Sequence, residues 1–241
     1  MRVQDIEYSA DGARMIGQFA VDDKRSGRRP GILVCHEGPG LTDHTKKIAA
    51  RLAGLGYAAF AMDYYGDGKP LANPADSMTR LAPWRADPTG IRVRANKALE
   101  ALAAQKDVDP AKLAVIGYCF GGTTALEVGR SGSDVKAIVG FHSGLATARP
   151  QDATNIRGKV LVCIGAEDPI IPAEQRVAFE KEMQAAGCDW RVQVYGGAGH
   201  SFTNPAADAR GMKGFYYHEP TDRRSWNAMI ELFNETLGVV K

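Results

Sequence analysis

A glycine-rich hexapeptide between an apolar strand and a helix most constrains the fold of this chain. Residues 117–122 read GYCFGG. The apolar run at 113–116 predicts a short buried strand, and residues 123–128 predict the first turns of a helix. A sharp turn must then hold Cys119, and glycine at the flanking positions lets strand and helix approach without side-chain collision. The pattern predicts a nucleophile elbow on a strained turn.

The side chain at the centre of the predicted elbow is a thiol. Cys119 would lie at the N-terminus of a helix, where the partial positive charge of the helix favours a thiolate. A thiolate in that position is a candidate nucleophile. The alternative interpretation is a buried cysteine beside a glycine-rich turn, without a chemical role.

The length and composition are those of an ordinary globular protein, enough for one large α/β domain or two small ones. The 241 residues are 44% hydrophobic and 24% charged, and no shift in composition marks a domain boundary. Lys and Arg number 30 against 28 Asp and Glu and are scattered, which argues against a nucleic-acid partner. The N-terminus lacks the apolar core of a signal peptide, and no apolar run reaches the roughly 18 residues of a membrane span. We therefore expect a cytoplasmic protein with no membrane partner, either a monomer or a dimer.

The four cysteines lie far apart in the sequence: Cys35, Cys119, Cys163 and Cys188. There is no C-x-x-C pair and no histidine at metal-ligand spacing, so we expect neither a disulfide framework nor a zinc site. Cys35 and Cys163 lie inside apolar runs, where a free cysteine behaves as a small buried hydrophobic residue, and Cys188 falls in a predicted turn. Cys119 is the one of the four at a predicted elbow.

Strands and helices alternate along the chain. Apolar runs predict strands at 6–9, 13–19, 30–35, 57–62, 113–116, 135–140, 160–165 and 191–195. Amphipathic patterns predict helices at 46–55, 92–105, 123–128, 172–186 and 224–237. An Asp-Gly turn joins the first two strands as an antiparallel hairpin. The alternation predicts a doubly wound, mostly parallel sheet covered on both faces, in a single domain spanning residues 1–241.

One long segment departs from this alternation. Residues 64–89 are rich in Gly, Pro, Asp and Asn, which predicts an irregular connection. The segment also contains Arg80, Trp84 and Arg85. Irregular connections of this length usually serve as lids or binding segments, so we expect it to cover a site.

Chemically useful side chains follow four of the predicted strands. Ligands bind at the carboxyl ends of the strands in sheets of this kind, so these side chains should meet. They are His36 and Glu37, then Cys119, then Glu167 and Asp168, and finally His200. The chain order of nucleophile, acid and histidine is that of α/β-hydrolases.

His200 is the candidate general base because it lies in the loop GGAGH, which is too glycine-rich to exist for its own packing. Asp168 would fix the imidazole tautomer and stabilise the imidazolium. Glu167 is the competing carboxylate. Asp168 is preferred because it directly precedes Pro169, which redirects the chain.

Four motifs taken together resemble the dienelactone hydrolases (carboxymethylenebutenolidases), the cysteine-nucleophile branch of the α/β-hydrolases. The motifs are GYCFGG at 117–122, HEGPGL at 36–41, EDPIIP at 167–172 and GHSF at 199–202, and the resemblance covers nearly the whole chain. It implies an α/β-hydrolase fold. It also implies hydrolysis of a small ester or lactone substrate through a covalent thioester, without a cofactor or metal.

The same resemblance implies roles for particular residues. Cys119, His200 and Asp168 would form a catalytic triad. Glu37 would be a further acidic residue that holds the resting thiol and exchanges partners when substrate arrives. The backbone N–H groups of Phe120 and Gly38 would form the oxyanion hole, which suits a tetrahedral intermediate.

One position departs from the family pattern. Dienelactone hydrolases have an arginine four residues after the catalytic histidine to bind the substrate carboxylate, and this chain has Asn204 there. A second carboxylate-binding arginine comes from the long middle segment, where Arg80 and Arg85 are both available. An asparagine cannot replace a guanidinium clamp, so we expect neutral esters or lactones to be tolerated.

Pocket walls are usually apolar and aromatic, and Trp84, Phe141 and Phe202 are the candidates for them. His142 follows a strand end and could approach the site. His44 and His218 could do the same or be ordinary surface residues.

A rival function belongs to a different class. Cys119 could be a redox-sensing or ligand-binding thiol on a hydrolase scaffold that no longer turns over. The two hypotheses differ in whether Asp168, His200 and the oxyanion donors are needed.

Overall fold

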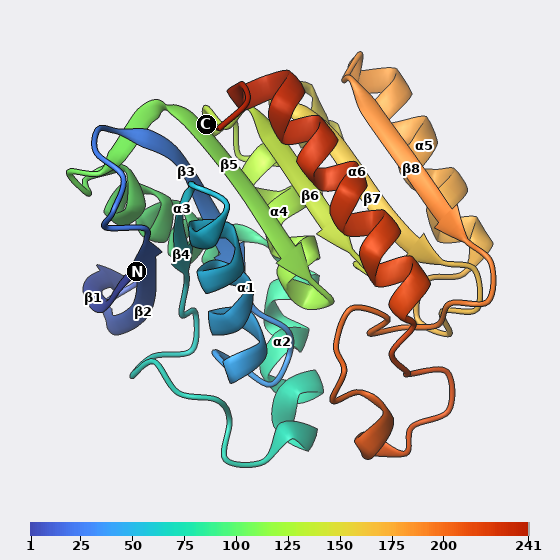
Figure 1. Ribbon diagram of the computed structural model, residues 1–241. Coiled ribbons are helices and arrows are strands. Elements are labelled where there is room, and N and C mark those ends of the chain that lie inside the picture. Colours follow the sequence, from blue (N-terminus) through green and yellow to red (C-terminus); the bar gives the residue numbers. More distant parts are fainter. Residues whose placement is uncertain (241) are drawn as a thin grey trace.

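The computed structural model describes residues 1–240, in which eight strands form one sheet (Figure 1). Its spatial order is β1-β2-β4-β3-β5-β6-β7-β8. The pairs β1–β2 and β2–β4 are antiparallel, and the other neighbouring pairs are parallel. The strands are β1 Arg2–Ala10, β2 Ala13–Val21, β3 Arg29–Cys35, β4 Ala58–Ala61, β5 Val108–Tyr118, β6 Ala137–Phe141, β7 Lys159–Gly165 and β8 Trp190–Tyr195. The predicted antiparallel opening and mostly parallel sheet are confirmed.

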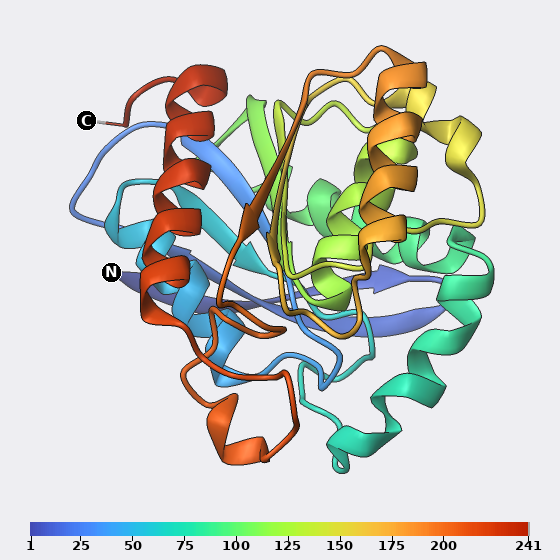
Figure 2. The same cartoon turned by 90° about the vertical axis from the view of Figure 1, so that its right-hand side faces the viewer.

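Helices cover both faces of this sheet (Figure 2). One face carries α1 and α6, and the other carries α3, α4 and α5. The α-helices are α1 Asp43–Gly54, α2 Ser77–Ala86, α3 Thr89–Ala103, α4 Phe120–Arg130, α5 Ala173–Ala186 and α6 Glu219–Leu237. Short 3₁₀ segments are η1 Pro74–Asp76, η2 Pro150–Asn155 and η3 Asp208–Arg210.

The central strands are apolar because both of their faces are buried. All seven residues of β3 are buried, and so are the last six residues of β7. Their side chains alternate between two hydrophobic clusters, one under α3, α4 and α5 and the other under α1 and α6. Each fully buried aliphatic side chain contributes about 1.5–3 kcal/mol relative to exposure, so a continuous apolar run is favoured in these strands.

The N-terminal hairpin closes as the Asp-Gly pair predicts. Asp11 and Gly12 have φ of 53° and 70°, the left-handed backbone of a two-residue hairpin turn. The paired strands extend beyond the predicted ranges, from Arg2 paired with Val21 to Ala10 paired with Ala13. The extra residues of the first strand are mostly exposed and polar, so they lack the apolar signal on which the prediction rests.

The segment 64–89 is more regular than the sequence predicts. It contains η1 and the ten-residue helix α2, so the expectation of an irregular loop is wrong there. The sequence hides α2 because Pro83 lies inside it and Leu81 is its one buried residue, which leaves almost no amphipathic pattern. The segment passes below the carboxyl ends of the strands in Figure 1, opposite the segment that follows β8.

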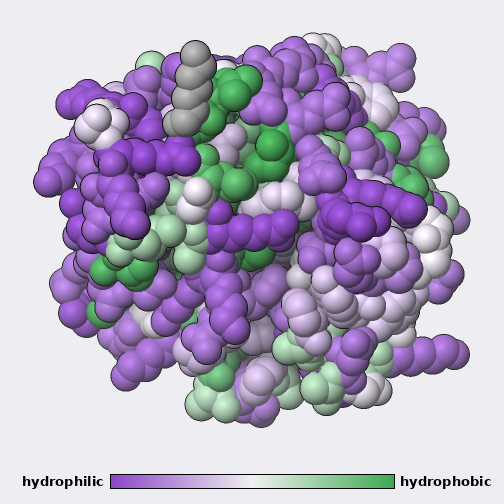
Figure 3. Space-filling view, viewed as in Figure 1, coloured by the Kyte–Doolittle hydropathy of each residue, from purple (hydrophilic) through white to green (hydrophobic). Residues whose placement is uncertain are grey.

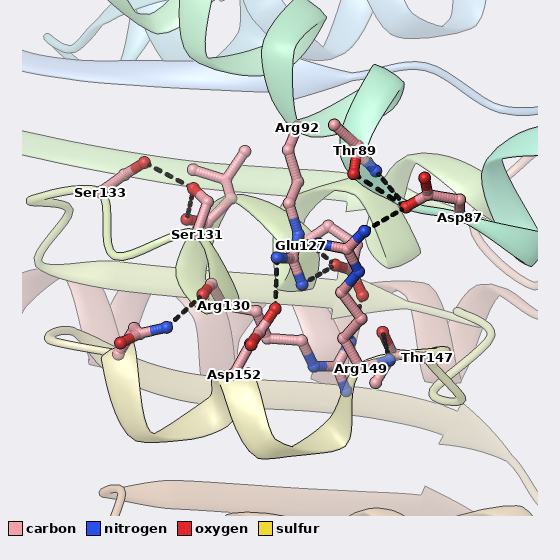
Figure 4. Close-up of polar contacts among 12 residues, drawn as sticks. Asp87, Thr89, Arg92, Glu127, Arg130, Ser131, Ser133, Thr147, Arg149 and Asp152 are labelled. Carbon is pink, nitrogen blue, oxygen red and sulfur yellow. Dashed lines mark hydrogen bonds and ion pairs between the residues drawn. The ribbon is translucent and has the colours of Figure 1, made fainter.

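A buried ion-pair network ties together the helices on one face (Figure 4). The fully buried Arg130 of α4 pairs with Glu127 at 2.9 Å and with Glu182 of α5 at 2.8 Å. Arg92 of α3 pairs with Glu127 at 2.7 Å and with Asp152 of η2 at 2.5 Å. Each desolvated charge therefore has an opposite partner, which burial requires.

The surface is mainly polar on the face seen in Figure 3, with apolar side chains in small separate areas. Among residues 1–240, no helix combines the length and apolar character needed to cross a membrane. Among the same residues, no group of three or more His, Cys, Asp and Glu side chains is arranged to hold a metal ion.

Candidate active site

Cys119 lies on a strained turn between β5 and α4. Its backbone has φ 54° and ψ −122°, a conformation that residues with side chains rarely adopt. A Cβ added to Gly117 would lie 2.0 Å from the carbonyl oxygen of Gly121, and one added to Gly121 would lie 2.2 Å from that of Cys35. The strand, turn and helix are those the sequence predicts. Glycine is required because the backbones touch.

The backbone of the elbow is also held from β6. The N–H of Cys119 donates to the carbonyl of Phe141 at 3.0 Å and lies 3.1 Å from Nδ1 of His142. Nε2 of His142 lies 2.9 Å from the hydroxyl of Thr203. Burial, reinforced by the charge of His200, lowers the pKa of His142 well below its usual value. His142 therefore approaches the site as a neutral ring beneath the elbow.

The other two histidines considered from the sequence lie elsewhere. The ring of His44 packs edge-on against Tyr118 at 5.5 Å, and His44 lines a cavity that does not include Cys119. Nδ1 of His218 bonds to the hydroxyl of Thr221 at the start of α6. Neither residue lines a cavity that reaches Cys119.

His200 is paired with Asp168. Nδ1 of His200 lies 2.7 Å from Oδ2 of Asp168, and both side chains are almost fully buried. The other carboxylate oxygen, Oδ1, accepts the N–H of Ile170 at 2.8 Å. The competing Glu167 is exposed and accepts instead from the hydroxyl of Tyr216 at 2.9 Å. Of the two carboxylates, Asp168 is the one in contact with the imidazole.

The surroundings of His200 favour its charged form. Burial opposes the charge, but the adjacent Cys119 and then the Asp168 carboxylate outweigh it and raise the pKa of His200 to about 10. Nε2 is buried and lies outside hydrogen-bond geometry to any atom of residues 1–240, although the neighbouring Cys119 thiol is close enough to raise the pKa of the imidazole. That nitrogen is therefore available to exchange a proton with the thiol or with a bound molecule.

The loop that carries His200 is fixed by the segment 212–217. The N–H of His200 donates to the carbonyl of Gly214 at 2.7 Å, and the N–H of Tyr216 donates to the carbonyl of His200 at 3.1 Å. A Cβ on Gly199 would lie 2.3 Å from the same Gly214 oxygen, which explains the glycine. The ring of Phe215 then packs 4.9 Å from the imidazole.

Glu37 contacts partners other than the thiol. Its Oε2 accepts from Nδ2 of Asn204 at 2.9 Å and lies 3.6 Å from the guanidinium of Arg210. Its Oε1 is buried without a partner among the described residues. The expected hold of Glu37 on the resting thiol is therefore absent from this conformation, in which Asn204 and Arg210 hold the carboxylate.

Two backbone N–H groups near Cys119 are free to donate to a ligand. Gly38 and Phe120 each follow directly a residue considered for the site, Glu37 and Cys119. Across residues 1–240, neither N–H donates to an acceptor. Phe120 lines one cavity and Gly38 lines another, and both cavities reach Cys119.

Two cavities, of about 420 and 480 Å³, reach the thiol. Residues common to both are Met78, Arg85, Cys119, Ile170 and His200. The first cavity extends along the loop after β6, from Gly144 to Ala148, and the second extends between Gly38, η1 and the segment 210–215. Cys119 and His200 therefore stand where two chambers meet.

The three aromatic residues predicted as pocket walls line neither chamber. Phe141 and Phe202 are fully buried in the cluster under α1 and α6, where Phe141 stacks on Tyr118. Trp84 stacks on Phe120 with ring centroids 6.2 Å apart, one layer behind the chamber. The prediction fails because Phe141 and Phe202 point into the core below the strand ends and Trp84 faces Tyr64 and Phe120 from its place in α2.

The polar predictions are also corrected. Asn204 lies against Glu37 and away from both chambers, and Arg80 lies over the ring of Tyr65. Arg85 lines both chambers and makes no ion pair within residues 1–240. Sequence reasoning missed Arg210 because it ends the short segment η3, which carries no motif, six residues after Asn204.

The family model of the dienelactone hydrolase family matches residues 16–237. The chain belongs to the dienelactone hydrolase family. The span of the match contains Glu37, Cys119, Asp168 and His200, and the α/β-hydrolase fold agrees with it. Membership places the protein in a family of hydrolases, as the resemblance of its motifs implies.

Individual proteins are similar to this chain over almost their whole length. Protein usf of Aquifex pyrophilus is 29% identical, with 97% of this chain and 99% of that protein covered. A solved structure named m3DLH is 45% identical, with a TM-score of 0.95 and 98% of each chain covered. A dienelactone hydrolase-like promiscuous phosphotriesterase from metagenomic libraries is 42% identical, with a TM-score of 0.94 and 98% and 99% coverage.

Proposed function

We propose that this dienelactone hydrolase-family protein hydrolyses small carboxylic esters or lactones through a covalent thioester on Cys119. The observation that carries the proposal is the strained elbow at Cys119, beside the buried His200–Asp168 pair and at the junction of two chambers. Strain of this kind is retained where it exposes a reactive side chain. A thiol needed for redox sensing alone requires neither an aligned imidazole nor two free N–H groups.

In the first half-reaction the sulfur of Cys119 attacks the carbonyl carbon, and the thiol proton resides on Nε2 of His200. The carbonyl π electrons move to its oxygen, which accepts from the N–H groups of Phe120 and Gly38. Collapse of this intermediate breaks the ester C–O bond, and His200 gives its proton to the leaving alkoxide. An alcohol departs, or the hydroxyl arm of an opened lactone stays attached.

In the second half-reaction water attacks the thioester carbon while Nε2 of His200 takes its proton. The same two N–H groups hold the second oxyanion. Breaking the C–S bond releases the carboxylic acid and returns the proton to the sulfur or leaves it on His200. Asp168 keeps Nδ1 protonated throughout and stabilises the imidazolium.

Arg85 is placed to favour substrates that carry a carboxylate. It is the arginine common to both chambers, and it lacks an ion-pair partner within the described part of the chain. A carboxylate on the substrate could pair with this one guanidinium, while the apolar walls formed by Met78 and Ile170 suit a neutral ester. We therefore propose that both kinds of substrate are accepted, with Arg85 giving the acid an advantage of about 10- to 100-fold.

A second activity is favoured by one of the relatives. The relative that is 42% identical is described as a promiscuous phosphotriesterase. A thiolate that attacks carbon can also attack phosphorus, forming an S–P bond and expelling an aryloxide; water, deprotonated by His200, then attacks phosphorus, breaks the S–P bond and releases the phosphodiester. We propose neutral aryl phosphotriesters as a second substrate class, tested by release of 4-nitrophenolate from a dialkyl 4-nitrophenyl phosphate.

Mass spectrometry of protein quenched during turnover tests the main proposal. A panel of aryl esters and lactones would be hydrolysed, and tryptic peptides containing residue 119 would be searched for the mass of the acyl group. We expect an acyl adduct on Cys119 that disappears when substrate is exhausted. An adduct on another residue, or turnover without any adduct in Cys119→Ala, would reject the mechanism.

A further inference from the structure

His36 is a buried histidine that has no step in the proposed chemistry. Its ring is fully buried and stacks on Tyr64, with centroids 3.5 Å apart and planes at 24°. Burying an imidazole is costly unless its polar atoms are used. One of its nitrogens, Nε2, has no hydrogen-bond partner within residues 1–240. Any polar contact that offsets the cost of burying this ring must therefore come from the other nitrogen, Nδ1.

That other nitrogen, Nδ1, lies 2.7 Å from the carbonyl oxygen of Glu37. A carbonyl oxygen only accepts, so Nδ1 carries the proton and donates. Burial lowers the pKa of His36 to about 4, which leaves the ring neutral and Nε2 unprotonated near pH 7. The tautomer is therefore set by the Glu37 carbonyl.

The same carbonyl is held from two further directions. The N–H of Gly40 donates to it at 3.1 Å, and the hydroxyl of Tyr64 lies 3.3 Å away while donating to the carbonyl of His36 at 2.6 Å. The hydroxyl of Tyr65 donates to the carbonyl of Gly38 at 2.8 Å. The peptide units on both sides of Gly38 are thus fixed by their oxygens.

Fixing an oxygen also aims the N–H of the same peptide unit. All peptide bonds in residues 1–240 are trans, so the N–H of Gly38 points opposite to the carbonyl of Glu37. The carbonyl points at His36 and Tyr64 in the interior. The N–H of Gly38 has no acceptor among the described residues, and Gly38 lines the chamber that holds Cys119.

We propose that His36 and Tyr64 are positioning residues that aim the Gly38 N–H at the oxyanion by clamping the Glu37 carbonyl. This inference rests on the proposed function, since an oxyanion forms only if Cys119 attacks a carbonyl group. A donor that is already aligned costs no reorganisation during the reaction, which is why fixed donors accelerate it. A loose peptide unit could rotate its N–H away from the developing charge.

The kinetic test compares two replacements of His36. His36→Phe keeps a ring against Tyr64 but removes the donor, and we expect kcat to fall roughly 10- to 100-fold while KM changes less than about threefold. His36→Asn offers an amide N–H to the same oxygen and should recover most of kcat. Tyr64→Phe, which removes a secondary contact, should lower kcat by about 3- to 10-fold.

A second measurement separates the clamp from the nucleophile. Alkylation of Cys119 by iodoacetamide proceeds without an oxyanion, so its rate should stay unchanged in His36→Phe. The matched control is Tyr57→Phe, a buried tyrosine that packs on Phe233 under the opposite face, and its kcat should equal that of the wild type. Parallel falls in kcat and alkylation rate, or no advantage of Asn over Phe, would reduce His36 to a packing residue and overturn the proposal.

A third readout needs no turnover. The ¹⁵N order parameter of the Gly38 amide should be that of a rigid backbone, about 0.85, in the wild type and should fall in His36→Phe, with Phe120 unchanged. An unchanged Gly38 order parameter would overturn the clamp. Failure of the proposed function would appear differently, as full esterase activity in Cys119→Ala.

Discussion

The elbow and the chamber walls are fixed by different kinds of contact. At the elbow, backbone atoms touch, and a Cβ on Gly117 would lie 2.0 Å from the carbonyl oxygen of Gly121. At the walls, side chains from α2 and from the segments after β6 and β8 meet around a space, and Met78 is 61% exposed. Few residue types can build the first region, whereas many can build the second. Substitutions at the elbow should therefore abolish activity, whereas substitutions at the walls should reduce it partially and to different extents.

The largest effect is expected at the elbow itself. Cys119→Ala removes the nucleophile, and we expect kcat for aryl esters to fall by at least about 10³-fold, since donors and binding alone retain little catalysis. Cys163→Ala and Cys188→Ser, which change thiols in the core and beside η2, are matched controls and should keep activity within a few-fold. Comparable loss in a folded control variant would move the nucleophile away from Cys119.

The next effect concerns the pair behind the elbow. His200→Ala and Asp168→Asn should each lower kcat by roughly 10²- to 10⁴-fold, because one supplies the proton transfer and the other fixes the imidazole. Glu167→Gln is the control, since Glu167 bonds to Tyr216 at the surface. Steady-state assays and circular dichroism would separate catalysis from folding. A greater loss in Glu167→Gln than in Asp168→Asn would assign the acid to Glu167.

The elbow could be predicted from sequence because backbone sterics leave a direct mark on residue type. Glycines at 117, 121 and 122 indicate a close approach of backbones, and continuous apolar runs indicate the buried strands. The place of Asp168 before Pro169 favours it over Glu167, and the contact with His200 agrees. Each of these features depends on neighbours in the chain.

The walls could not be predicted because they depend on residues distant in the chain. Trp84 and Phe202 are aromatic, as pocket linings usually are, but neither lines a chamber. Trp84 stacks on Phe120, and Phe202 packs in the cluster under α1 and α6. Arg210 reaches Glu37 across 173 positions by folding of the segment after β8. The role of His36 could not be predicted either. Its ring bonds to the carbonyl oxygen of Glu37 because of the backbone conformation there, which the motif HEGPGL does not reveal.

A wall residue should give a graded effect that depends on the substrate. Arg85→Gln removes the guanidinium common to both chambers, and we expect kcat/KM for a carboxylate-bearing lactone to fall about 10- to 100-fold, the value of one charge-assisted hydrogen bond. The methyl ester of that lactone should change less than about threefold. Arg80→Gln is the matched control, because Arg80 lies over Tyr65 outside the chambers. Equal losses for acid and ester would show that Arg85 supports the wall without binding the carboxylate.

The smallest effect is on the thermal stability of the folded protein. Its dependence on pH should differ between a substitution in the buried His200–Asp168 pair and one in a chamber wall. The pKa of His200 is raised to about 10 in the folded protein, against about 6.5 in an unfolded chain. A raised pKa means that the folded state binds the proton more tightly, so this stabilisation is complete below about pH 6.5 and is lost progressively as the pH rises through 10. The difference in Tm between wild type and His200→Gln should therefore be largest near pH 6 and narrow by a few degrees toward pH 10. Arg85→Gln, on a wall, should show a Tm difference that does not follow this course. A constant gap for His200→Gln from pH 6 to 10 would mean that the imidazole is already neutral near pH 7 and takes the thiol proton only when substrate binds.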